Sequence, residues 1–238
     1  MTALISALSL LAPFAAEPDV SDIVQPGFKD ATFELKVVKA NFGELKKIDD
    51  DFGNQYRFKS VKISVKEPLM LRMEAKVDDT SLLYIVDGFR RLSRIPRAGI
   101  NVKENLKDAP GKIQTPLDFG VVSPTVVKEL FDAKYIRTDR ATGQYVFDFT
   151  YKRPKFDDTS RHRIWFDPEK RYTAKREVYN QYGRQLSTFF YEEPTQSGGI
   201  WLPTKVTVKN TDGKVAAVSE VLSLKVNFGL PESMFQIK

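Results

Sequence analysis

Residues 163–228 alternate polar and apolar side chains over several strand-length runs, which Gly, Asn, Asp and Pro separate. Runs with this period and length are typical of antiparallel β-hairpins. The pair Asp212-Gly213 lies between two of the runs, and Asp-Gly in that position favours a hairpin turn. The pattern predicts a meandering antiparallel sheet, which the N-terminal part of the chain extends or covers.

Further strands are predicted upstream. Residues 69–77 alternate most clearly, and residues 145–151 place four aromatic side chains on one face. Such alternation is expected for a sheet with one face on the core and the other in water. Residues 29–48 show an approximate helical stripe, and a strand over residues 33–38 is the competing interpretation. The predicted fold class is α+β and mainly β.

Residues 96–124 lose the alternation and are rich in Pro, Gly, Asn and Lys. A long irregular stretch in a compact domain is usually a functional loop or a lid. The stretch ends at Ser123-Pro124, which is typical of a helix start, and a short helix is predicted over residues 125–133. This helix is either a mobile lid or an inert helix on the sheet. Its apolar residues are Val126, Val127, Leu130 and Phe131.

The length of 238 residues is enough for one sizeable domain with a hydrophobic core. The 37 Lys and Arg residues against 31 Asp and Glu residues give a formal net charge of +6. These basic residues are scattered and form no cluster interleaved with aromatic residues, so we expect no nucleic-acid partner. Weak attraction to an anionic membrane surface is compatible with this charge.

The N-terminal residues 1–16 resemble a secretory signal peptide. An uncharged apolar run over residues 3–12 is followed by Pro13 and small residues, and it is too short to span a membrane. No Lys or Arg precedes the run, and a partly buried N-terminal helix is the alternative. We expect a signal peptide over residues 1–16, one domain over residues 17–238, and a soluble monomer in the periplasm or another extracytoplasmic compartment.

The sequence offers no catalytic constellation. It has no cysteine, which excludes disulfides, thiol nucleophiles and cysteine-ligated zinc. No nucleophile-elbow, phosphate-loop or dinucleotide motif accompanies its one histidine, His162. The adjacent carboxylates at residues 157–158 and 192–193 point apart, unlike a glycosidase pair. We predict no enzyme activity, no cofactor and no metal site.

What remains is a set of apolar residues that the alternation places on the inner face of the sheet. Either the chain's own helices fill the concave face and the set is only core, or the curved sheet is incompletely filled and the set lines an apolar cleft beneath residues 96–133. The set consists of Leu71, Met73, Phe147, Phe149, Ile164, Phe166, Phe190, Leu202, Val206 and Leu222.

Several short motifs resemble the outer-membrane lipoprotein-sorting (LolA-like) superfamily. Trp165-Phe166-Asp167-Pro168 is similar to a recurrent strand end of that superfamily. Similar elements follow at residues 176–179, 201–204, 212–214 and 226–231, and early strands match at residues 68–74 and 87–88. The resemblance covers about residues 33–235. The order and spacing of the motifs are typical of the superfamily rather than of any one member.

The resemblance implies an unclosed antiparallel half-barrel with short helices covering its concave face over a hydrophobic cavity. Members carry the acyl chains of lipoproteins through the periplasm, or use the same cavity in envelope-stress sensing. In the carrier, a basic residue before the strand-opening proline hydrogen-bonds the lid. Here that position is Glu67, and Arg72 is the candidate substitute for lid gating. The long stretch of residues 96–124 is a second departure.

We therefore expect an exported, non-catalytic protein that carries a lipid or lipoprotein acyl chain in a cavity lined by the inner-face set, beneath a lid formed by the predicted helix. Its partners would be a lipid or an acylated lipoprotein, with transient contact to a membrane or a membrane protein. A periplasmic sensor domain that binds a membrane-anchored protein is the alternative. A structural envelope protein with a fully packed sheet is a second alternative.

Overall fold

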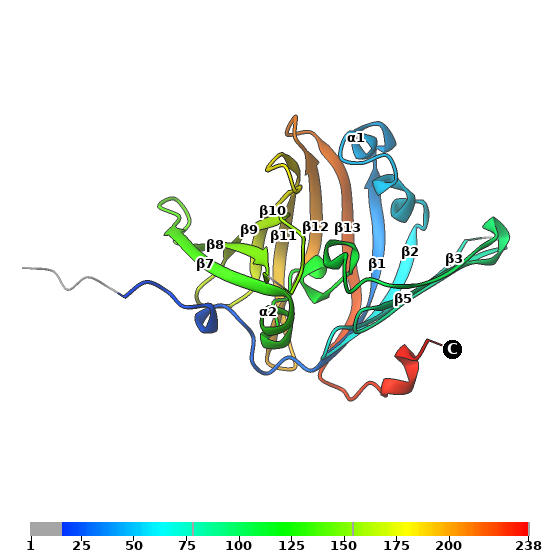
Figure 1. Cartoon of the computed structure of the whole chain (residues 1–238), viewed down its shortest axis with the longest axis horizontal. Helices are drawn as coiled ribbons and strands as arrows, with labels where there is room; N and C mark the ends of the chain where they lie inside the picture. The colour runs from blue at the N-terminus through cyan, green and yellow to red at the C-terminus, as the bar shows by residue number, and fades with distance from the viewer. Residues whose placement is uncertain (1–15, 78, 154, 238) are drawn as a thin grey trace, which may run out of the picture.

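The computed structural model describes residues 16–77, 79–153 and 155–237. Within them, thirteen strands form one antiparallel sheet in the order β6-β5-β4-β3-β2-β1-β13-β12-β11-β10-β9-β8-β7 (Figure 1). The strands are β1 (Asp30–Ala40), β2 (Ser60–Lys66), β3 (Met70–Val77), β4 (Thr80–Asp87), β5 (Arg90–Ile95), β6 (Ile100–Asn105), β7 (Phe131–Thr138), β8 (Tyr145–Tyr151), β9 (Arg161–Phe166), β10 (Thr173–Tyr179), β11 (Gln185–Ser197), β12 (Ile200–Asn210) and β13 (Val215–Val226). The predicted class, an unclosed and mainly antiparallel half-barrel, is confirmed.

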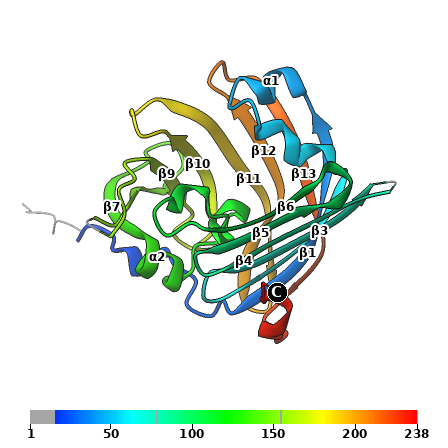
Figure 2. The same ribbon diagram turned by 45° about the vertical axis from the view of Figure 1, so that its right-hand side comes forward.

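The strand order requires one connection to run from one edge of the sheet to the other. β1 to β6 form one series of hairpins, β7 to β13 form another, and the two series meet where Ala31 of β1 pairs with Val226 of β13. The two edge strands, β6 and β7, are therefore consecutive in the chain. Their connection, residues 106–130, runs from one edge of the sheet to the other and lies within the curve of the sheet (Figure 2).

The stretch of residues 96–124 is more ordered than expected. It contains the edge strand β6 and three short 3-10 helices, and each of these helices begins with a proline, which suits the first helical position. The expectation of an irregular stretch was therefore wrong for residues 100–105, where β6 pairs with β5. The three helices are η3 (Pro96–Ala98), η4 (Pro110–Lys112) and η5 (Pro116–Phe119).

The predicted helix over residues 125–133 is present but shorter. α2 (Pro124–Leu130) begins as expected, since the Ser123 hydroxyl accepts a hydrogen bond from the Val126 backbone N–H at 3.2 Å. It ends at Leu130 because Phe131 pairs with Tyr151 as the first residue of β7. Phe131 therefore belongs to the sheet and not to the helix.

Residues 29–48 form mainly a strand. β1 runs through the region expected as helix or strand, and only α1 (Phe42–Lys46), capped by the Asn41 side chain, is helical there. The β-branched pair Val37-Val38 suits the strand. The remaining short helices are η1 (Val20–Asp22), η2 (Phe52–Arg57) and η6 (Glu232–Phe235).

The aromatic strand β8 supplies much of the core. Phe147, Phe149 and Tyr151 are buried on the face that α2 covers, and the ring centroid of Phe131 lies 4.8 Å from that of Tyr151. A second buried cluster joins β1–β4 to Leu106, Ile113 and Val121 of the connection. The connection thus acts as a roof, packed on both halves of the sheet.

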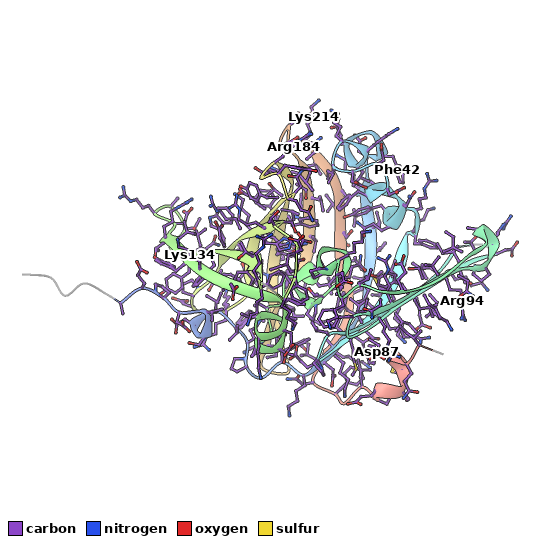
Figure 3. All side chains as sticks on the ribbon, in the orientation of Figure 1. Phe42, Asp87, Arg94, Lys134, Arg184 and Lys214 are labelled. Atoms are coloured by element: carbon purple, nitrogen blue, oxygen red, sulfur yellow. The ribbon has the colours of Figure 1, made fainter. Side chains whose placement is uncertain are left out.

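The C-terminal residues lie against the outer face of the sheet. Phe235 packs with Ile85 and Leu92, which alternate with the inward-facing residues of β4 and β5. Charged side chains such as Arg184 and Lys214 point outward from the hairpin turns (Figure 3). No helix in the described part of the chain combines the length and the apolar character needed to span a bilayer. The predicted signal peptide falls almost wholly on residues 1–15, outside the described residues.

Candidate functional site

The connection is anchored closely to the concave face around η5. The ring of Phe119 meets that of Phe33 edge-on at 5.3 Å, and the Tyr191 hydroxyl donates to the Leu117 carbonyl at 3.2 Å. Gly120 has a φ of 81°, and a Cβ at this position would lie 2.8 Å from Cγ of Pro203. Only glycine suits both the backbone angle and this close approach.

A cavity of about 370 Å³ remains between the roof and the sheet. Its apolar wall on β1–β4 consists of Leu35, Val37, Val61, Ile63, Met73 and Leu82. A further apolar side of the cavity consists of Ile48, in the turn after α1, and of Phe52 and Tyr56 in η2. The exposed residues Asp49 and Gln55 also line it, so the cavity reaches the surface beside η2.

A buried ion pair closes the other side of this cavity. Nη1 of Arg176 on β10 donates to Oδ1 of Asp118 in η5 at 2.9 Å, and the Arg176 side chain is only 4% exposed. The guanidinium carbon also lies 4.6 Å from the ring centroid of Phe189. Burial acts to lower the pKa of Arg176, but Tyr191 and Asp118 outweigh it and raise the pKa, so the group stays charged.

His162 lies beside this pair. Val178 faces His162 across the β9–β10 ladder, and Arg176 faces Ile164, so His162 and Arg176 are diagonal neighbours on one face. Burial, with a smaller contribution from the Arg176 charge, lowers the pKa of His162 to about 3. The imidazole is therefore neutral at pH 7. The ring packs edge-on against Phe131 at 5.7 Å.

The predicted cavity-lining residues divide into four groups. Met73 and Val206 line the cavity. Phe147, Phe149, Ile164 and Phe166 are at most 1% exposed and pack in one cluster with the predicted lid residues Val126, Val127, Leu130 and Phe131. Leu71 and Leu202 belong to the second buried cluster.

The last two predicted lining residues lie elsewhere. Phe190 is half-buried beneath Nζ of Lys209, which lies 4.9 Å from its ring centroid, and Leu222 is 38% exposed. Both stand outside the cavity lining.

Arg72 is placed away from the roof. Its Nη1 donates to the carbonyl of Met234 at 2.9 Å and its Nη2 to Glu74, so it fastens the C-terminal segment to the outer face. The arginines that contact the roof are Arg176, through Asp118, and Arg91, whose Nη1 donates to the Lys112 carbonyl at 3.4 Å. Arg176 lies between Lys175 and Glu177, which face outward, so the period of two places Arg176 on the inner face of β10. A single arginine on this otherwise apolar face is the sequence signal that could have identified it.

Comparison with solved structures identifies the fold. A domain assigned to outer membrane lipoprotein sorting from Vibrio parahaemolyticus superposes with a TM-score of 0.58 at 14% identity, over 91% of this chain and 92% of that chain. A LolA superfamily protein from Nitrosomonas europaea gives a TM-score of 0.57 at 14% identity, over 91% and 93%. A DUF1329 family protein from Desulfovibrio piger gives 0.51 at 12% identity, over 88% and 90%.

The chain has the LolA-like fold, as its sequence motifs led us to expect. A model of a family described as "Uncharacterized protein" matches residues 124–238, which run from α2 to the C-terminus. A search of curated proteins found no significant match.

Proposed function

We propose that this protein is an exported, non-catalytic carrier that binds an acyl chain of a lipid or lipoprotein in the cavity between sheet and roof. The observation that supports it best is the apolar wall of β1–β4, which stays uncovered by the chain's own side chains over a volume of about 370 Å³. Ligand pockets are concave, mostly apolar and about 300–1,000 Å³ in volume. The LolA-like fold of the chain agrees with this proposal.

Burial of an alkyl chain in this cavity is energetically favourable. Burying a methylene contributes about 0.8 kcal/mol. A chain of about ten methylenes would gain about 8 kcal/mol, enough to offset part of the cost of association, which is about 4–15 kcal/mol. The proposal includes residues 1–16 as a signal peptide, which would deliver the protein to an extracytoplasmic compartment where it meets membrane lipids.

The sensor alternative would place a protein partner in a groove on the outer face, beside the C-terminal segment. This groove combines charged residues such as Glu34, Lys62 and Glu74 with the apolar residues Phe228, Leu230 and Met234. Its charged residues interrupt the apolar surface, whereas the cavity under the roof has a continuous apolar wall, so the acyl-binding proposal has more support.

Native mass spectrometry of the purified chain, followed by lipid extraction, tests the proposal. We expect an acylated species to co-purify, or a synthetic lipopeptide to bind after delipidation. The absence of both would refute acyl binding.

A matched pair of variants locates the site. Val37 lines the cavity, whereas its neighbour Val38 is 53% exposed. Val37→Trp should fill the cavity and abolish binding, while Val38→Trp should bind as the unmodified chain does. Equal binding by both variants would place the acyl site elsewhere.

A further inference from the structure

Three polar atoms of residues that line the cavity have no hydrogen-bond partner within the described residues. They are Nε of Arg176, Nδ1 of His162 and Oε1 of Gln114, and all three are buried. The three residues line the same cavity. Folded proteins rarely leave buried polar atoms unpaired, so three in one cavity indicate a site for a polar group.

Arg176 supplies a charged hydrogen-bond donor in this cavity, which suits an anionic group. Arg176 is the single cationic side chain among the described lining residues, and its partner Asp118 contacts only Nη1. The Asp118 side chain is 31% exposed and partly solvated, whereas that of Arg176 is 4% exposed. The Nε–H group of the guanidinium therefore remains an unpaired donor. Two parallel N–H groups on one edge of a guanidinium match the two oxygens of a carboxylate.

The neighbouring polar groups can also form hydrogen bonds with a carboxylate. Neutral His162 can donate from Nδ1, and the amide of Gln114 can present either its oxygen or its nitrogen. The other titratable groups facing Arg176 are Tyr191 and Tyr151, whose pKa values burial raises, so both are uncharged at pH 7. Asp118 is thus the one carboxylate in contact with the guanidinium.

The rest of the cavity fits a single alkyl chain. The polar residues lie on β9, β10 and the roof, and the apolar wall lies on β1–β4 across the concave face. A volume of about 370 Å³ corresponds to roughly a dozen groups of the ~30 Å³ that one water occupies. A methylene is of similar size, so this is room for one chain of about twelve carbons and not for two.

We propose that the cavity binds a free fatty acid, with its carboxylate on the Nε edge of Arg176, beside His162 and Gln114, and its alkyl chain along β1–β4. This inference rests on the proposed acyl-binding function and names the ligand class.

The carboxylate site is tested by displacement of a fluorescent fatty-acid probe from the delipidated chain. The three competing ligands have alkyl chains of equal length: laurate, methyl laurate and dodecylammonium. We expect laurate to bind at least tenfold more tightly than the other two, which corresponds to about 1.4 kcal/mol. Equal affinity for laurate and methyl laurate, or preference for dodecylammonium, would overturn the carboxylate site and leave acyl binding standing. Failure of all three to bind would overturn the proposed function as well.

Variants then assign the preference to residues. Arg176→Met combined with Asp118→Asn removes both charges, so the variant should bind laurate and methyl laurate with equal affinity. Arg163→Met is the matched control, because Arg163 pairs with Asp148 and is absent from the cavity lining. If the double variant does not fold, His162→Phe should still reduce the ratio of the affinity for laurate to that for methyl laurate severalfold. A preference that survives in the folded variants would refute the assignment.

Discussion

Asp118 of the roof and Arg176 of the sheet are joined by a 2.9 Å hydrogen bond between opposite charges, across 58 positions of the sequence. Asp118 also accepts a 2.8 Å hydrogen bond from the Thr115 backbone N–H. One carboxylate therefore shapes the turn η5 and attaches it to β10.

Arg176→Met should destabilise the protein by about 2–4 kcal/mol, because it leaves a partly buried carboxylate without its partner. Asp118→Asn should have a similar effect, and the double variant should be less destabilised than the sum of the two. Urea unfolding of the four proteins measures this coupling. Strictly additive values would show that the two residues do not stabilise each other.

Phe149→Asp should prevent folding. Phe149 is fully buried, with its ring centroid 5.6 Å from that of Phe131 and 5.9 Å from that of Phe166, and an unpaired charge there has no solvent or partner. Phe190→Asp, at a half-buried position, is the control and should fold. Circular dichroism separates the outcomes: a folded Phe149→Asp protein would show that the cluster beneath α2 is dispensable.

Asp30→Ala should loosen the C-terminal segment. The buried Asp30 carboxylate accepts hydrogen bonds from the backbone N–H groups of Phe228, Gly229 and Leu230 at 3.0, 3.1 and 3.3 Å. Unpaired buried donors cost about 1–3 kcal/mol. Hydrogen exchange at residues 228–230 should speed up in the variant. Asp22→Ala, at an exposed position in η1, is the control and should leave this exchange unchanged.

Acid should destabilise the protein partly through His162. Its pKa is lowered to about 3 in the fold, against about 6.5 when unfolded, so between these values the unfolded chain binds the extra proton. The contribution is complete above pH 6.5 and is lost as the pH falls towards 3, with a slope of at most about 1.4 kcal/mol per pH unit. In His162→Gln the free energy of unfolding should depend less on pH over this window. An unchanged slope would contradict the buried, neutral imidazole.

The sheet was predictable because its information is local. Alternation on β3 and β8 and the Asp-Gly turn after β12 depend on neighbouring residues, so the period of two placed these elements. The end of α2 was harder to predict, because Phe131 belongs to β7 through its pairing with Tyr151, which is distant in the sequence.

The division of apolar residues between core and cavity was not predictable from the sequence. Phe149 and Met73 both face inward, and only the path of the roof decides that the first is covered by α2 and the second borders open space. Arg176 could have been identified from the sequence as the one charged residue on an apolar strand face. Its partner Asp118 could not, because Asp118 lies in the connection between β6 and β7, whose sequence has no periodic pattern.

The pairing of β1 with β13 has a consequence for biosynthesis. The seam that unites the two series of hairpins joins Ala31 to Val226, so both series must be synthesised before it can form. Contacts between such distant residues form late, because loop-closure entropy opposes them. A nascent chain would thus lack this seam, and with it a continuous sheet, until β13 has been synthesised.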